Sequence, residues 1–196
     1  MKNILVTGGA GFIGSNYIKY MSNVHPEYNI VNLDKIANDC NCENLRYVKD
    51  STNYKFINGN ISDRRFIFNL FEKEKFDVVV NFASEHDCDD NTEDKSEFII
   101  TNIIGTQALL DASKEYGVRR YHQVSTNDVY EDLESTDEPC YIASKIASDK
   151  LVMAYEKEYN LKSTISRHGK VYDIESYCKS LDDIIHNGTP GEIYSI

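Results

Sequence analysis

The stretch NILVTGGAGFIG, Asn3–Gly14, decides the fold of this chain. Its first half is apolar and β-branched, as in a buried strand, and Gly8, Gly11 and Gly14 follow at a spacing of three. Gly9, Gly11 and Gly14 also match the pattern G-x-G-x-x-G. Because these glycines lie between an expected strand and an expected helix, their backbone N–H groups can approach a pyrophosphate at the helix N-terminus. The stretch therefore predicts a dinucleotide-binding turn, and the alternative is an ordinary glycine-rich turn.

Beyond this stretch, apolar runs alternate with helical segments along the whole chain. Strands are expected at 3–7, 29–33, 54–57, 77–82, 120–125, 163–166 and 192–196, and helices at 12–23, 63–75, 96–116, 141–159 and 175–187. The polar segment 36–53 is expected to be a loop with one helical turn. Several strands are apolar without alternation, which is typical of a sheet covered on both faces. The order predicts parallel strands joined by right-handed crossovers, in a doubly wound α/β sheet of the Rossmann type.

The charge balance and the length of the apolar runs exclude some partners. Lys plus Arg number 21 and Asp plus Glu 32, giving a net charge of −11. An acidic surface repels phosphate backbones, so a nucleic-acid partner is not expected. The apolar runs are far shorter than the roughly 20 residues of a membrane helix, and the N-terminus does not read as a signal peptide. We therefore expect no membrane association and a cytoplasmic location.

The cysteines and the acidic clusters do not predict a metal site. The chain has 5 cysteines, and this odd number without a secretory signal favours reduced thiols. Cys40 and Cys42 resemble half of a metal clip, but the chain has no second pair with ligand spacing. The segment Glu85–Asn91, EHDCDDN, contains ligand types at a spacing that fits no common template. A solvated acidic loop is the favoured interpretation of this segment.

Asp34 extends the interpretation of the glycine turn. It lies 20 positions after Gly14, at the end of the second expected strand. A carboxylate there can accept hydrogen bonds from ribose hydroxyls and would repel a 2′-phosphate, which favours NAD over NADP. Lys35 is adjacent and weakens this preference. The alternative role of Asp34 is that of a helix-capping residue.

Tyr141 and Lys145 form a second candidate site in the sequence YIASK. At this spacing the two side chains share one face of a helix, so the ammonium can lie near the phenol. The ammonium and an oxidised nicotinamide would lower the pKa of the phenol, which could then take the proton of a sugar hydroxyl. Thr126, at the carboxyl end of an expected strand, could hold the same oxygen. The alternative is a surface pair on an amphipathic helix.

With these motifs, residues 1–167 resemble the extended short-chain dehydrogenase/reductase family, most closely its dTDP-glucose 4,6-dehydratase branch. The resemblance is carried by MKNILVTGGAGFIGSN, NYKFINGNISD, VVNFASE, TNIIGTQALLDASKEYGV, QVSTNDVY and YIASKIASDKLVMAY. It implies tightly held NAD and C4 oxidation of a nucleotide sugar by Tyr and Lys. An Asp acid and a Glu base then expel water, and the hydride returns to C6.

The resemblance also implies roles for individual residues. It places the catalytic residues at Thr126, Asn127, Asp128, Tyr141 and Lys145. It places the NAD-binding residues at Gly8, Gly11, Phe12, Ile13, Gly14, Asp34, Asn60, Ile61, Ala83, Thr101, Asn102, Tyr141 and Lys145. Two changes affect the chemistry, because Asn127 replaces the family's Asp and Asp128 replaces its Glu. An amide has no proton to donate near neutral pH, so we expect dehydration to be impaired.

Length is the largest departure from the family, whose members are much longer. The closing GEIYSI resembles a late segment of the family. Only a short segment separates it from SRHGKVYD. We therefore expect residues 1–196 to form a single NAD-binding domain, with 168–196 a remnant of a substrate region that is largely absent. The alternative is a shortened form of a full enzyme.

These expectations lead to one preferred function and one competitor. The preferred function is that of an NAD-dependent lyase-like protein acting on a nucleotide sugar of the dTDP-glucose type. The competitor is a non-catalytic NAD-binding or subunit-interaction protein. Apolar residues on several faces of 96–116 and 141–159 suggest a homodimer through these helices. Burial of those residues within the chain is the alternative.

Overall fold

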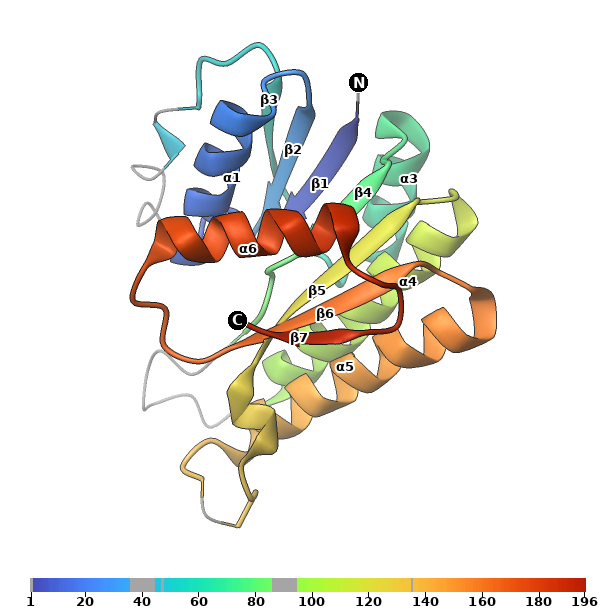
Figure 1. Cartoon of the computed structure of the whole chain (residues 1–196). Helices are drawn as coiled ribbons and strands as arrows, with labels where there is room; N and C mark the ends of the chain where they lie inside the picture. The colour runs from blue at the N-terminus through green and yellow to red at the C-terminus, as the bar shows by residue number, and fades with distance from the viewer. Residues whose placement is uncertain (1, 36–44, 47, 86–94, 135) are drawn as a thin grey trace.

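The computed structural model of the chain describes residues 2–35, 45–46, 48–85, 95–134 and 136–196. Cys40, Cys42 and most of the acidic segment 85–91 therefore lie outside the described residues. Within the described part, a parallel sheet is flanked by helices on both faces (Figure 1). The predicted doubly wound α/β fold is confirmed.

The described strands form one seven-stranded sheet with the order β3-β2-β1-β4-β5-β6-β7. Their bounds are β1 Asn3–Thr7, β2 Asn29–Asp34, β3 Tyr54–Asn58, β4 Val78–Asn81, β5 Arg120–Thr126, β6 Ser163–His168 and β7 Ile193–Ser195. Each neighbouring pair is parallel. The strand order reverses between β1 and β4, and ligands of such sheets bind beside this switch point at the carboxyl ends of the strands.

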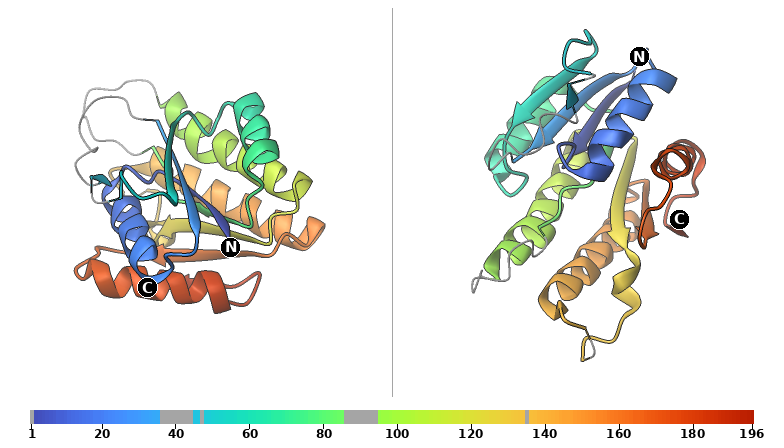
Figure 2. Two further views of the ribbon diagram at one scale, coloured as in Figure 1. Left: turned by 90° about the horizontal axis from the view of Figure 1, so that it is seen from above. Right: turned by 90° about the vertical axis from the view of Figure 1, so that its left-hand side faces the viewer.

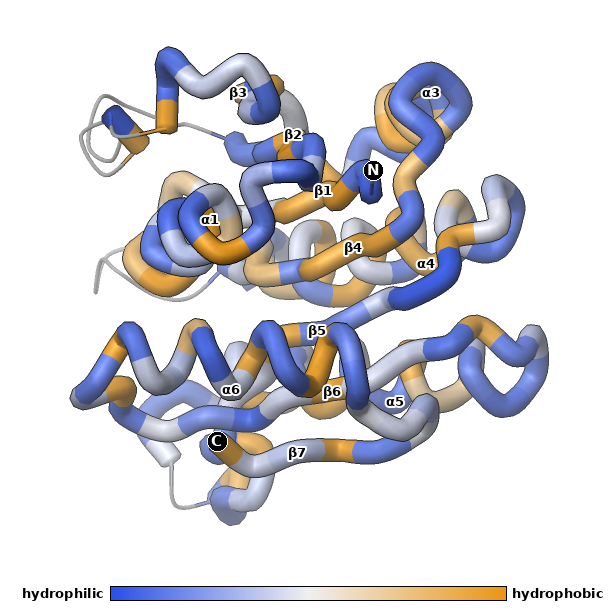
Figure 3. Tube along the Cα trace, turned by 45° about the horizontal axis from the view of Figure 1, so that its top comes forward, coloured by the Kyte–Doolittle hydropathy of each residue, from blue (hydrophilic) through white to orange (hydrophobic). Residues whose placement is uncertain are grey.

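Two groups of helices cover the two faces of the sheet (Figures 1 and 2). α1 (Phe12–Val24) and α6 (Ile174–Asn187) lie on one face. α3 (Arg64–Glu74), α4 (Thr106–Glu115) and α5 (Pro139–Tyr159) lie on the other. Each face has its own apolar core, and Figure 3 shows the hydrophobic residues concentrated along β1 and β4 between them. Burial from both sides explains why these strands are apolar without alternation.

The segment 96–116 differs from the single helix expected. It begins as a π-helix over Phe98–Gly105 and continues as α4. A π-helix is a wider turn that is frequently found at functional sites. The wider turn buries Phe98, Thr101 and Asn102, and it packs against α5.

The apolar residues behind the expected homodimer differ in how far they are exposed, and three of them, Ile103, Ile146 and Leu151, are partly buried. Leu109, Leu110 and Ile142 are buried within the chain. Ile99, Ile100, Ile104 and Met153 are exposed on the π-helix and α5. Burial within the chain therefore explains only part of the pattern.

The last part of the chain, residues 168–196, completes the same sheet. After β6 it forms α6 and then β7, which pairs with β6 at the edge of the sheet. Among the described helices, none combines the length and the apolar character needed to cross a bilayer.

Candidate active site

The glycine turn after β1 is packed so tightly that two of its glycines admit no side chain. Gly8 has φ +70°, and a Cβ there would lie 2.6 Å from the backbone nitrogen of Ala83. A Cβ on Gly14 would lie 2.5 Å from the carbonyl oxygen of Gly8. Both separations are too short for real atoms, so the first turn of α1 sits directly on the glycine turn, with β4 behind it.

The N-terminus of α1 has no side-chain cap, in contrast to the starts of α3 and α6. Asp63 accepts a hydrogen bond from the Phe66 N–H at 2.9 Å and so caps α3, and Asp173 caps α6 in the same way. Gly11 precedes the first residue of α1, and no described side chain caps the N–H groups there. A Cβ on Gly11 would meet only the Gly8 oxygen, at 3.3 Å. Uncapped N–H groups at a helix start are the feature that binds an anion.

Asp34, at the end of β2, reaches the glycine turn. Its Oδ2 accepts a hydrogen bond from the Ala10 N–H at 2.7 Å. Burial raises the pKa of its carboxyl group, although hydrogen bonds from the backbone of Ala10 and Lys35 oppose the shift. The structure thus brings Asp34 beside the turn, as the spacing predicts, and its carboxylate also orders the turn.

The segment after β4 links the glycine turn to Tyr141. Ala83 lies against Gly8. Ser84, the next residue, hydrogen-bonds the Tyr141 side chain. Glu85 is held by Asn102, whose side chain accepts from the Glu85 N–H at 2.7 Å and donates to the Glu85 oxygen at 3.0 Å. Three consecutive residues therefore connect the turn, the tyrosine and the π-helix.

Tyr141 is partly buried, in an environment that makes its phenol a weaker acid. Burial raises the pKa of its phenol to about 12, with additional contributions from the charges of Asp128 and Glu138, and the hydrogen bond with Ser84 only partly opposes them. In the protein without a ligand, Lys145 is not among the causes that set this pKa. Loss of solvation is the largest of them, and the nearby carboxylates add to it.

Lys145 points toward the sheet. Its Nζ donates a hydrogen bond to the carbonyl oxygen of Val124 at 3.2 Å. Burial lowers the pKa of its ammonium to about 8, although Asp149 opposes the shift. Lys145 is thus a buried cation close to its titration point at neutral pH.

Thr126, Asn127 and Asp128 follow β5 and begin a 3₁₀ helix, Asn127–Tyr130. The Thr126 hydroxyl donates to Asp128 Oδ2 at 2.6 Å and accepts from the Asp128 N–H at 3.2 Å. In this structure the Thr126 hydroxyl thus orients Asp128. The sequence, in contrast, predicts that this hydroxyl contacts a substrate oxygen. Asn127 Oδ1 is buried and has no hydrogen-bond partner among the described residues.

The other residues expected at the cofactor have varied surroundings. Ile61 is buried and packs against Gly105, whose Cβ would lie 2.5 Å from the Ile61 side chain. Asn60 accepts hydrogen bonds from the Ser62 N–H at 2.9 Å and hydroxyl at 2.8 Å, so its side-chain oxygen is turned to its own loop. At the start of α1, Phe12 is exposed and Ile13 is partly buried.

Two polar residues on the π-helix were also expected at the cofactor. Thr101 is buried, and its hydroxyl has no hydrogen-bond partner among the described residues. Asn102 also donates to the Ser144 hydroxyl at 2.8 Å, so it ties the π-helix to α5. The structure therefore gives Asn102 a scaffolding role, while the Thr101 hydroxyl has an unused hydrogen-bonding capacity.

Sequence reasoning missed several residues at this edge of the sheet. His168 pairs with Thr126 in the register of β5 and β6. Burial lowers the pKa of its imidazole, with Lys145 and Asp128 acting in opposite directions. Arg167 donates to Asp149 Oδ2 from Nε at 3.0 Å and from Nη2 at 2.9 Å. The spacing of Lys145 and Asp149 on one helix face could have identified Asp149, whereas nothing local marks His168.

Comparison with known proteins agrees with this geometry. The model of the family described as NAD dependent epimerase/dehydratase matches residues 4–177. A dTDP-D-glucose 4,6-dehydratase from Mus musculus is 39% identical over 90% of this chain and 52% of its own length. A dTDP-glucose 4,6-dehydratase from Haemophilus influenzae is 36% identical over 92% of this chain and 59% of its own length. The chain therefore spans about half the length of these relatives.

Solved structures show the same similarity. The dTDP-glucose 4,6-dehydratase of Bacillus anthracis, in complex with NAD, has a TM-score of 0.87 and 30% identity. The match covers 100% of this chain and 75% of that one. DesIV, a dTDP-glucose 4,6-dehydratase from Streptomyces venezuelae, has a TM-score of 0.84 and 28% identity, and the match covers 99% of this chain and 75% of that one. The matched sequence, the parallel sheet and the glycine turn lead to one conclusion: the chain belongs to the NAD-dependent epimerase/dehydratase family.

Proposed function

We propose that the chain binds NAD and oxidises the C4 hydroxyl of a nucleotide sugar of the dTDP-glucose type. The observation that carries this proposal is the continuous path from Gly8 through Ala83 and Ser84 to Tyr141. This path supports a site in which the Tyr141 and Lys145 pair acts on a ligand bound at the glycine turn. The names of three of the similar proteins support the substrate class, since those from Mus musculus, Haemophilus influenzae and Bacillus anthracis are named as 4,6-dehydratases of dTDP-glucose.

The residues present fit NAD. The uncapped first turn of α1 offers N–H groups to a pyrophosphate, and Asp34 lies where ribose hydroxyls would meet a carboxylate. NAD, when bound, accepts the hydride from the sugar carbon. The role we assign to Tyr141 is to take the proton of the sugar hydroxyl. In the same proposal, the positive charge of Lys145 favours the deprotonated form of the phenol.

Dehydration needs an acid that this chain lacks at the expected position. Asn127 carries an amide, which has no acidic proton near neutral pH. Asp128 keeps a carboxylate, but it is held by Thr126 and is one methylene shorter than a Glu. Displacements near 1 Å cost on the order of a hundredfold in rate. We therefore propose that oxidation proceeds and that the loss of water is impaired.

The decisive experiment mixes the protein with NAD and dTDP-glucose. We expect NADH absorbance to appear on the protein without the alkali-sensitive 4-keto-6-deoxy product, because the half-reaction stalls. Product formed with turnover would contradict the impaired dehydration. NAD binding without either signal would contradict the proposed oxidation.

The last outcome would favour the second candidate, a non-catalytic NAD-binding protein. The specific observation behind this candidate is the pKa of Tyr141, raised to about 12 in the ligand-free protein. A phenol with this pKa is a poor base at neutral pH.

The glycine turn offers a matched pair of substitutions. Gly11→Ala adds a methyl group 3.3 Å from the Gly8 carbonyl oxygen, where it would block a pyrophosphate, so we expect NAD affinity to fall at least about tenfold and the melting temperature to fall less than in Gly14→Ala. Gly14→Ala overpacks the turn and should destabilise the fold by about 1–3 kcal/mol. Calorimetric titration with NAD and thermal unfolding measure the two effects. Equal melting temperatures for both variants would contradict this assignment.

We further propose that residues 1–196 act as one NAD-binding domain, with 168–196 corresponding to a reduced substrate region. The single sheet that α6 and β7 complete supports this view. A second copy of the chain would cover Ile99, Ile100 and Ile104, which are exposed on the π-helix. Sedimentation velocity should then show a dimer, and Ile104→Lys should shift it to monomer. A monomeric wild-type chain would contradict the dimer.

A further inference from the structure

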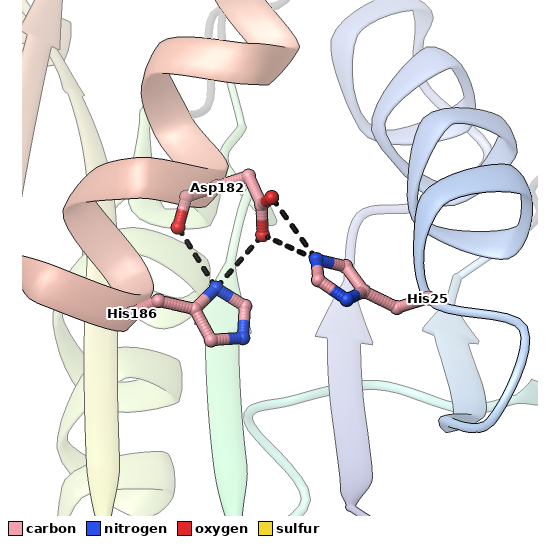
Figure 4. Close-up of side chains that lie close together, drawn as sticks. All are labelled: His25, Asp182 and His186. Carbon is pink, nitrogen blue, oxygen red and sulfur yellow. Dashed lines mark hydrogen bonds and ion pairs between the residues drawn. The ribbon is translucent and has the colours of Figure 1, made fainter.

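Three potential metal ligands meet between α1 and α6, on a part of the molecule that the proposed reaction does not use (Figure 4). His25 Nε2 lies 3.0 Å from Asp182 Oδ2, and His186 Nδ1 lies 2.8 Å from Asp182 Oδ1. One ligand atom from each of the three residues lies within 4.8 Å of the others. The side chains are mostly buried, with exposed fractions of 21% for His25, 14% for Asp182 and 18% for His186.

The outer nitrogens of the two imidazoles have oxygen partners of their own. His25 Nδ1 faces Glu27 Oε1 at 3.7 Å. His186 Nε2 lies 3.1 Å from the Tyr28 hydroxyl. Metal-binding histidines characteristically donate the N–H of the second nitrogen to an oxygen, which fixes the tautomer and the ring orientation. Both rings are therefore oriented with one nitrogen toward Asp182 and the other toward an outer oxygen.

We propose that His25, Asp182 and His186 form a binding site for a divalent transition metal ion of the Zn²⁺ type, which fastens α6 to α1. Two imidazoles and one carboxylate are a donor set that Zn²⁺ uses in proteins, with water as the fourth ligand. In a tetrahedral site with Zn–N near 2.0–2.1 Å, ligand atoms lie about 3.3 Å apart. The observed separations of 2.8 and 3.0 Å need only a small expansion.

Binding exchanges hydrogen bonds for metal–ligand bonds. The imidazole nitrogens and the carboxylate now share protons, and these protons are released when the ion binds. His186 Nδ1 is also hydrogen-bonded to the Asp182 carbonyl oxygen at 2.9 Å, and this contact is given up. No residue of the glycine turn and no residue near Tyr141 takes part.

The position of the cluster predicts a structural role. His25 is the residue that ends α1, and Asp182 and His186 lie in the last two turns of α6. Both helices end at the amino side of the strands, whereas the glycine turn and Thr126 lie at the carboxyl side. The ion would join residues that are 157 positions apart in the sequence, and it would hold the final helix of the chain on the sheet.

The test uses the full chain stripped of metal and titrated with Zn²⁺ alone, by calorimetry and thermal unfolding. We expect one equivalent to bind and the melting temperature to rise by about 5–10 °C at a hundredfold excess over Kd. Co²⁺ should give the visible absorption of a tetrahedral site. NAD affinity should be the same with and without the metal, which separates this proposal from the proposed function.

Matched variants locate the site. Asp182→Asn should weaken Zn²⁺ binding at least about tenfold, whereas Asp183→Asn should change it by less than about twofold, because Asp183 is exposed on the same helix and is bonded to Asn187. His25→Gln provides a second ligand variant if Asp182→Asn fails to fold. No stoichiometric uptake of Zn²⁺ would overturn the proposal. So would equal losses in Asp182→Asn and Asp183→Asn, or Zn²⁺ binding that His25→Gln leaves intact.

Discussion

Tyr141→Phe should reduce the rate of NADH formation from NAD and dTDP-glucose by about 10²–10⁴-fold, the usual contribution of a positioned acid–base group. The phenol is the hydroxyl that Ser84 ties to the segment behind the glycine turn, so its removal takes away the proton acceptor. The ring itself packs near Phe98, with centroids 6.3 Å apart, and a phenylalanine keeps this contact. NAD affinity and the melting temperature should therefore change little. Single-turnover absorbance at the NADH band measures the rate.

Tyr116→Phe is the matched control, because it removes a phenol at the end of α4, away from the glycine turn. This variant should react at the wild-type rate. The wild-type rate should also rise with pH below the raised pKa of Tyr141, since only the phenolate can take the proton. Asp128→Asn removes one of the charges that raise this pKa and should move the profile to lower pH. A pH-independent rate, or full activity in Tyr141→Phe, would assign the proton transfer to another group.

Asn127→Asp should raise the yield of the 4-keto-6-deoxy product by about 10²–10⁴-fold, if the missing acid limits dehydration. The structure adds a reason to expect an acid of suitable strength. Asn127 Oδ1 is buried without a partner among the described residues, so a carboxyl group in the same place would have its pKa raised by desolvation. Such a group keeps its proton closer to neutral pH and can donate it to the leaving hydroxyl.

The double variant Asn127→Asp with Asp128→Glu tests the second change. A Glu at 128 regains the missing methylene but must keep the hydrogen bond that Thr126 now donates to Asp128. Asp132→Asn, an exposed change in the following loop, is a control that should leave the product yield unchanged. NADH without product in the double variant would show that a feature other than these two residues limits dehydration, which contradicts the acid hypothesis.

Much of the fold could be predicted because its signals are local. The glycine spacing predicts the turn, and the continuous apolar runs predict strands covered on both faces. The seven strands of the described sheet begin and end within two residues of their expected bounds. The exception is the π-helix. Its wider turn is accompanied by hydrogen bonds from Asn102 to Glu85 and Ser144, which lie elsewhere in the sequence.

The sequence by itself determined the alternation of strands and helices, the dinucleotide turn and the Tyr-x-x-x-Lys pair, since each depends on residues within a few positions of one another. Only the tertiary structure decided that Asp128 and burial raise the pKa of Tyr141, that Asp149 neutralises Arg167, and that two histidines share Asp182. These properties depend on distances across the fold and on the exclusion of water. No spacing along the chain records either quantity.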